Sequence, residues 1–145
     1  MMKRFNRAKG FTLVELLTAI AIVGILASIA IPTFQEYTRK ARYSELVQTT
    51  SSYQTAVGIC YNRTGGLNQC FGGQNGIPAN IINSSSTGLV RYLFTLGNGR
   101  IFVFPNNQNG FTLLGDYLIA TPTVSGSMVT WQYSGPAVTN GWVTQ

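Results

Sequence analysis

The first part of the chain carries one continuous apolar stretch, from Phe11 to Ile31, which a single charged residue, Glu15, interrupts. About 21 residues at roughly 1.5 Å each form a helix about 30 Å long, which matches the thickness of a bilayer core. Four cations precede the stretch and none lies within it, which predicts a cytoplasmic N-terminus and an exported remainder. The pattern therefore predicts a transmembrane helix.

The pattern changes after Pro32, where apolar residues recur at helical spacing on one stripe only. The stripe consists of Tyr43, Leu46, Val47, Thr50, Tyr53, Val57 and Tyr61. We predict one helix of about 50 residues, whose second half packs on a sheet through this stripe. Pro32 removes a backbone donor inside the helix and should kink or weaken it there.

The rest of the chain alternates between turn residues and short apolar runs. Residues 62–87 are rich in Gly, Asn and Ser and predict a long connecting loop. Strands are predicted at residues 89–96, 100–104, 117–121 and 127–133, with turn signals at 97–99 and 125–126. The predicted class is α+β, with one long N-terminal helix packed on an antiparallel sheet of about four strands.

Glu15 is an unusual residue for an apolar stretch, because a carboxylate without a partner in hydrocarbon costs several kcal/mol. No Lys, Arg or His lies between Gly10 and Pro32, so a counter-ion has to come from elsewhere. A new α-amino group, made by cleavage before Phe11, would supply one. The alternative is an ordinary secretory signal, whose apolar region is typically about 7–15 residues long and would not contain the acid.

The run KGFTLVELLTAIAIVGILASIAIPTFQEY resembles the class III signal and N-terminal helix of type IV pilins. Residues 56–60, Cys70 and residues 75–79 resemble the loop of a subgroup of major type IVa pilins. The resemblance implies that a prepilin peptidase cuts after Gly10 and that Phe11 becomes an N-methylated N-terminus. It implies that Glu15 is needed for methylation and assembly. It places Gly24 and Pro32 where the family loosens its helix.

The same resemblance divides the chain into a leader, a hydrophobic helix and a globular head. These are residues 1–10, 11–32 and 33–145, and the head comprises the second half of the helix (33–61), a disulfide loop (62–87) and the sheet (88–145). Similar pilins often have a second cysteine pair near the C-terminus. The tail at 141–145 has no cysteine, so a disulfide-bound C-terminal loop is not expected.

Cys60 and Cys70 are the only cysteines, and both lie on the exported side, where disulfides persist. A bond between them would close a loop of about 11 residues and stabilise the fold by about 3 kcal/mol. Two cysteines without any histidine make a poor metal site, and the spacing is not that of a redox Cys-x-x-Cys motif. We therefore predict a structural disulfide.

Charge and residue types argue against catalysis. Beyond the leader, six cations face four acids, so the charge of +6 for the whole chain falls to +2 and gives no reason to expect strong nucleic-acid binding. Without histidine or a free thiol, and with scattered acids, no catalytic, cofactor or metal site is expected. A patch that grips DNA is a weaker alternative to solvated faces; its residues would be Arg39, Lys40, Arg42, Arg91 and Arg100.

The expected function is that of a major pilin, the structural subunit of a type IV pilus that serves adhesion, twitching motility and DNA uptake. Its partners would be other copies of itself, the prepilin peptidase and methylase, the assembly machinery of the inner membrane, and the bilayer before assembly. The precursor would lie in the bacterial inner membrane and the product in an extracellular fibre. The alternatives are a minor or competence pilin that binds DNA, and a type II secretion pseudopilin.

Overall fold

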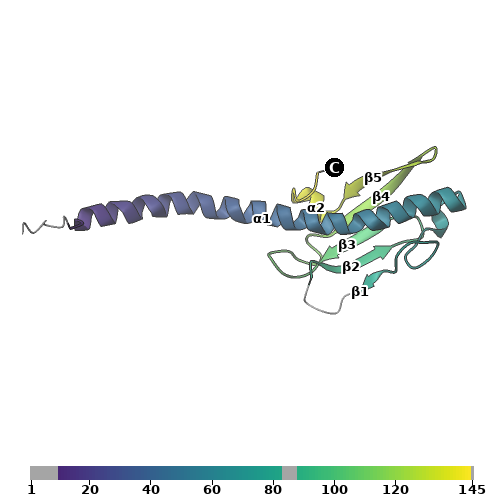
Figure 1. Ribbon diagram of the computed structural model, residues 1–145, viewed down its shortest axis with the longest axis horizontal. Coiled ribbons are helices and arrows are strands. Elements are labelled where there is room, and N and C mark those ends of the chain that lie inside the picture. Colours follow the sequence, from purple (N-terminus) through teal and green to yellow (C-terminus); the bar gives the residue numbers. More distant parts are fainter. Residues whose placement is uncertain (1–9, 83–87, 145) are drawn as a thin grey trace, which may run out of the picture. The chain divides into compact units, whose positions relative to one another are not determined.

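The computed structural model describes residues 10–82 and 88–144 and divides into two units, Met1–Tyr37 and Thr38–Gln145, here the N-terminal and C-terminal units (Figure 1). Along the chain the elements are α1 (Leu13–Thr64), the 3₁₀ helix η1 (Leu67–Gln69), β1 (Ile81–Ile82), β2 (Val90–Thr95), β3 (Ile101–Pro105), β4 (Leu118–Ser125), β5 (Met128–Ser134) and α2 (Pro136–Thr139). The predicted α+β class is confirmed.

Helix α1 continues through Pro32 and ends at Thr64, three residues beyond the predicted end of the helix. Proline has no N–H, so the carbonyl of Ser28 lacks its usual partner four residues on. Two hydroxyls nearby bond back onto the helix: Ser28 Oγ donates to the Ile25 carbonyl at 2.7 Å, and Thr33 Oγ1 donates to the Ile29 carbonyl at 3.0 Å. Such back-bonding satisfies hydroxyls where water is absent. The predicted kink at Pro32 stays a prediction.

The five strands form one antiparallel sheet in the order β1-β2-β3-β4-β5. Four of them match the predicted strands, and β1 is a two-residue addition within the region predicted as loop. The turn between β2 and β3 closes with a hydrogen bond from the Leu96 N–H to the Arg100 carbonyl at 2.9 Å. Gly99, at φ +73°, takes the left-handed conformation that this turn needs.

The core of the C-terminal unit lies between α1 and one face of the sheet (Figure 1). The predicted stripe is confirmed: five of its residues are buried, and Val47 and Tyr61 are half-buried. The sheet contributes alternate residues of its strands, namely Leu93, Ile101, Val103, Leu118 and Ala120. Apolar side chains that recur every 3.6 residues on the helix therefore meet apolar side chains that recur every two residues on the strands.

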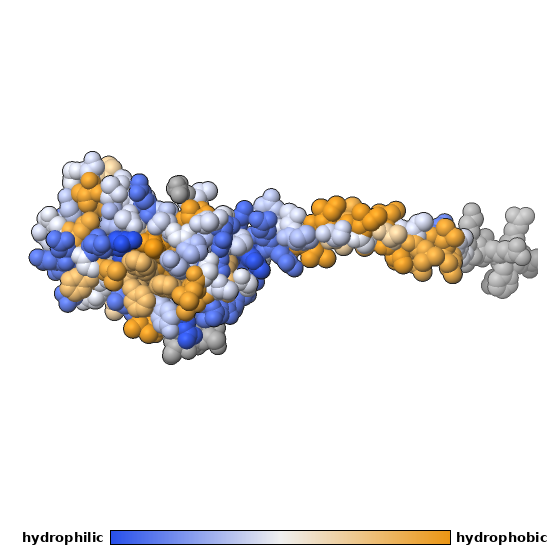
Figure 2. Space-filling view, turned by 180° about the vertical axis from the view of Figure 1, so that it is seen from behind, coloured by the Kyte–Doolittle hydropathy of each residue, from blue (hydrophilic) through white to orange (hydrophobic). Residues whose placement is uncertain are grey.

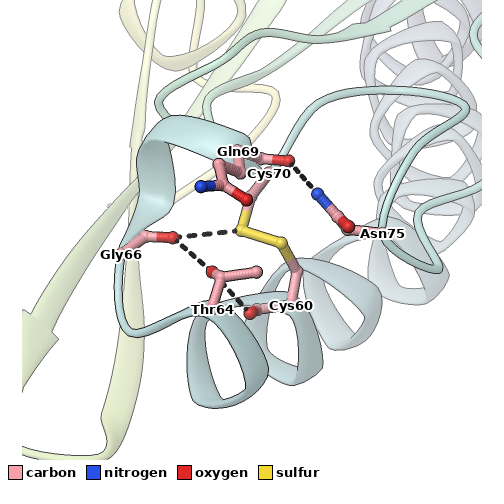
Figure 3. The surroundings of a disulfide bond; sticks show 6 residues. All are labelled: Cys60, Thr64, Gly66, Gln69, Cys70 and Asn75. Carbon is pink, nitrogen blue, oxygen red and sulfur yellow. Dashed lines mark hydrogen bonds between the residues drawn. A yellow bond between two sulfur atoms is a disulfide. The ribbon is translucent and has the colours of Figure 1, made fainter.

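The structure contains the Cys60–Cys70 disulfide, with the two Cα atoms 5.8 Å apart and both side chains fully buried (Figure 3). Thr64 Oγ1 donates to the carbonyls of Cys60 and Gly66, at 2.9 and 2.8 Å, where the chain leaves the helix. Residues 62–87 were predicted as a long connecting loop. Within this range the structure also places the end of α1, the 3₁₀ helix η1 and the short strand β1, and residues 83–87 fall outside the described residues.

The C-terminal segment is held by Asp116 rather than by a cysteine pair. Asp116 Oδ1 accepts hydrogen bonds from Trp142 Nε1 at 2.8 Å and from Asn140 Nδ2 at 3.0 Å. Its Oδ2 accepts from the Thr112 N–H at 2.8 Å, and Tyr43 of α1 donates its hydroxyl proton to the Asp116 carbonyl. A single buried acid therefore ties the segment before β4, the C-terminal segment and α1 together.

Candidate cleavage and assembly site

The proposed scissile bond, between Gly10 and Phe11, lies just before the first helical residue, Leu13. Phe11 is 84% exposed, and a Cβ built on Gly10 would meet no atom within 4 Å. A peptide bond that is outside regular structure and open to solvent is the kind that proteases reach. The preceding residues 1–9, the rest of the predicted leader, lie outside the described residues.

Thr12 and Glu15 form a capping box at the start of α1. Glu15 Oε2 accepts hydrogen bonds from the Thr12 N–H at 2.9 Å and the Thr12 hydroxyl at 2.6 Å, while the Glu15 N–H donates to Thr12 Oγ1 at 3.2 Å. This reciprocal pattern satisfies donors that the helix itself leaves open, and the helix dipole favours an acid in the first turn.

The capping box corrects one assumption drawn from the sequence. Glu15 does have polar partners within its own chain, although hydrogen bonds from Thr12 do not neutralise its charge. The spacing Thr-x-x-Glu before an apolar run is a known helix-start signal and would have revealed Thr12.

Exposed apolar side chains follow α1 beyond the capping box, and Figure 2 shows the hydrophobic surface that they form on one face of the helix. Those that are more than half exposed include Leu13, Val14, Leu16, Leu17, Ile20, Ile22, Val23, Ile25, Leu26, Ile29, Ile31 and Phe34. Among the described residues, α1 is the helix long and apolar enough to cross a bilayer. A helix that is apolar all round needs a non-aqueous environment on every side.

The remaining predicted site residues lie apart from this group. Gly24 and Pro32 are both inside α1, and a Cβ on Gly24 would meet nothing within 4 Å. Cys60 and Cys70 belong to the core of the C-terminal unit. The structure therefore brings Gly10, Phe11 and Glu15 together at the start of the helix and leaves the others elsewhere in the chain.

Comparison with known proteins decides the family. Residues 5–31 match the model of the prokaryotic N-terminal methylation motif. The solution structure of the major type IV pilin PpdD from enterohemorrhagic Escherichia coli aligns with a TM-score of 0.52 and 30% identity, over 68% of this chain and 69% of that one. This chain belongs to the type IV pilin family. The resemblance noted in the sequence is thereby confirmed.

Curated relatives match over about half of their length. Prepilin peptidase-dependent protein D of Escherichia coli K12 is 47% identical over 74 residues, which is 51% of each chain. The type IV pilus subunit TapA of Aeromonas hydrophila is 37% identical over 73 residues, or 50% of this chain and 51% of TapA. The major pilin PilE of Neisseria gonorrhoeae is 41% identical over 78 residues, or 54% and 44%.

The pilin spans about half the length of the curated relatives it matches. Their names, together with the shared helix-and-sheet fold, identify it as a type IV pilin-like structural subunit.

Proposed function

We propose that this pilin is the major structural subunit of a type IV pilus and polymerises through the N-terminal part of α1. The supporting observation is the apolar surface of that helix, whose large side chains are more than half exposed from Leu13 to Ile31. Burying apolar surface contributes about 25 cal/mol per Å², so a helix of this kind gains strongly from a bilayer or from neighbouring copies. A head-to-tail contact that does not close on itself gives an open helical fibre.

Cleavage between Gly10 and Phe11 would set the charge pattern for assembly. It removes the four basic leader residues and leaves a new ammonium group two residues before Leu13. That ammonium would be N-methylated and would pair with the Glu15 carboxylate of a neighbouring copy. In a medium of low dielectric such a pair attracts strongly, although desolvation offsets part of the gain.

The capping box is compatible with this proposal, because it leaves part of the Glu15 carboxylate open to a neighbour. Two hydrogen bonds from Thr12 hold one oxygen of Glu15. A carboxylate has about four lone-pair sites, so the other oxygen stays able to accept a bond from an incoming ammonium. Pairing would thus add to the cap rather than replace it.

Gly24 and Pro32 would serve as the places where the helix loosens during assembly. Glycine in a helix costs about 1 kcal/mol relative to alanine, and proline removes one backbone hydrogen bond. Both lie inside α1, with space around Gly24.

The cellular setting follows from the same chemistry. The precursor would lie in the inner membrane with residues 11–32 in the bilayer, where the peptidase, the methylase and the assembly machinery act on it. The polymer would be an extracellular fibre for adhesion and twitching motility, and its retraction would serve DNA uptake. Its relatives quoted above are named as pilus subunits, in keeping with a structural and not an enzymatic role.

Two substitutions separate pairing from capping. Glu15→Gln removes the charge but keeps an oxygen that can accept from Thr12, whereas Thr12→Val removes the hydroxyl's two hydrogen bonds in the cap and keeps the charge. We expect both variants to be exported and cut, with intact mass showing Phe11 as the first residue. Sheared filaments should be lost in Glu15→Gln and kept in Thr12→Val. Wild-type filament yield from Glu15→Gln, or a first residue other than Phe11, would refute the proposal.

A further inference from the structure

The sheet of the C-terminal unit has a second face, turned away from α1. Along β2 and β3, residues such as Leu93, Ile101 and Val103 are fully buried against the helix. The residues between them point to the opposite side, because side chains alternate along a strand. We define the aromatic face as Tyr92, Phe94, Phe102 and Phe104, together with Tyr117 just before β4, all of which are half-buried.

Four rings of this face, those of Tyr92, Phe94, Phe104 and Tyr117, form one connected cluster. Tyr92 and Phe94 lie nearly parallel, with ring centroids 5.8 Å apart and an angle of 15° between the planes. Phe104 meets both of them edge-on at 6.4 and 6.3 Å, and Tyr117 lies 5.3 Å from Phe104. Figure 2, seen from behind the view of Figure 1, shows hydrophobic residues gathered on this side among hydrophilic ones.

Two arginines lie against the aromatic face. Arg91 has no partner in the β2–β3 register, which shifts between Val90 and Tyr92, and its guanidinium carbon lies 5.5 Å from the centre of the Tyr92 ring. A bulge of this kind redirects a side chain. The Arg100 guanidinium carbon lies 5.2 Å from the centre of the Phe102 ring, and among the described residues its buried Nε has no hydrogen-bond partner.

Negative charge is scarce in the same unit. Residues 38–145 contain six cations and two acids, Glu45 and Asp116. Glu45 lies on α1, and Asp116 is 6% exposed with its carboxylate occupied by hydrogen bonds. The charge on the aromatic face is therefore complementary to an anion.

We propose that the aromatic face binds single-stranded nucleic acid, with bases stacked on the rings and phosphates paired with Arg91 and Arg100. Aromatic rings on an open sheet next to basic side chains are the combination by which proteins bind unpaired strands. A duplex hides the faces of its bases in its own stack, so it offers the rings nothing to contact. A second copy, face to face, would bring four guanidinium groups together, and like charges oppose such pairing.

The structure thus divides the basic residues that the sequence grouped into one patch. Arg91 and Arg100 lie on the aromatic face, whereas the guanidinium of Arg39 lies 5.9 Å from the ring of Trp142.

The test uses the full cleaved chain in a non-ionic detergent and a fluorescein-labelled 20-nucleotide oligo-dT as the probe. Anisotropy titrations between about 50 and 300 mM NaCl compare the affinity for oligo-dT with the affinities for an abasic strand of equal length and for a 20-base-pair duplex. We expect oligo-dT to bind about tenfold more tightly than either of these two probes at each salt concentration, since stacking needs unpaired bases. Affinity should fall as salt rises, because phosphate contacts release counterions.

Variants then locate the site. Tyr92→Leu should weaken binding about tenfold, and Arg91→Gln or Arg100→Gln should each lower the slope of log affinity against log salt by about 0.7. Arg63→Gln is the matched control, because Arg63 is an exposed cation in the last turn of α1. Circular dichroism reports whether each variant is folded. If Tyr92→Leu does not fold, the three arginine variants still show whether the phosphate contacts lie on the aromatic face.

Several results would overturn the proposal. Equal affinity for the abasic strand would mean that only phosphate charge is recognised. An equal loss of oligo-dT affinity in Arg63→Gln and Arg91→Gln would place the phosphate contacts outside the aromatic face. A wild-type chain that does not bind oligo-dT would exclude the proposal. Self-association in sedimentation runs that Tyr92→Leu abolishes, with oligo-dT binding unchanged, would assign the face to a second copy.

Discussion

Asp116 offers the sharpest test of how the C-terminal segment is held. Its carboxylate accepts four hydrogen bonds: two from Thr112, one from Asn140 and one from Trp142, at 2.8 to 3.1 Å. The substitution Asp116→Ala removes both acceptor oxygens, and with them all four hydrogen bonds, and leaves the Thr112 N–H and the Trp142 indole N–H without this partner. We expect the C-terminal unit to lose a large part of its stability.

The size of the loss follows from the bonds. A hydrogen bond to a charged group contributes about 1.5–3 kcal/mol, so the two from Thr112 N–H and Trp142 together contribute about 4 kcal/mol. For a unit of this size 1 kcal/mol shifts the melting temperature by about 4 °C, which gives a decrease of roughly 15 °C. Asp116→Asn keeps one carbonyl oxygen and should lose about half as much.

The pH dependence gives the same prediction a second readout. Burial raises the pKa of Asp116, but the hydrogen bonds from Thr112, Trp142 and Asn140 outweigh it and hold this pKa below its ordinary value. The stabilisation is therefore complete above the unfolded pKa of about 3.9 and is lost as the pH falls through the lower folded pKa. The difference in stability between wild type and Asp116→Asn should shrink below about pH 4.

Thermal unfolding of the full chain in detergent, followed by circular dichroism and tryptophan fluorescence, measures these effects. Asn140→Ala is the control, since it removes one exposed amide group, which donates to Asp116 Oδ1 and to the Gly115 carbonyl, and should lower the melting temperature by less than about 4 °C. A decrease of only that size in Asp116→Ala would refute the idea that this acid fastens the C-terminal segment.

Three further predictions concern the helix start, the disulfide and the β2–β3 turn. Thr12→Val should cost the cap about 1 kcal/mol and raise amide exchange in the first turn of α1 about fivefold, and unchanged exchange would argue against the capping box. Reducing Cys60–Cys70, or changing both to serine, should destabilise the C-terminal unit by about 3 kcal/mol in denaturant titrations. Gly99→Ala should destabilise the C-terminal unit by about 3 kcal/mol, because φ is +73° and the new Cβ would lie 2.9 Å from a methyl carbon in the core. Gly126→Ala, at φ +62° with open space around it, should destabilise the unit by only about 1 kcal/mol. Equal losses of stability in the two variants would exclude overpacking at Gly99.

Features that depend only on residues close together in the chain could be predicted from the sequence. The apolar stretch from Phe11 to Ile31, the buried stripe of α1 and the turn at Gly99 each depend on neighbours a few residues away. The cap formed by Thr12 and Glu15 is equally local, because its two residues are three positions apart in the chain. Local spacing and side-chain chemistry determine such features, since the helix and strand periods are fixed by the backbone.

Only the tertiary structure decided which distant residues meet. Trp142 and Asn140 reach Asp116 across 26 and 24 residues, and no pattern in the sequence pairs them. The same holds for the aromatic face, where strand pairing sets Tyr92 of β2 opposite Phe104 of β3, and for β1, whose two residues are a strand only because β2 lies beside them. Such contacts depend on register between separate strands and on the packing of loops, and neither has a period that a linear sequence displays.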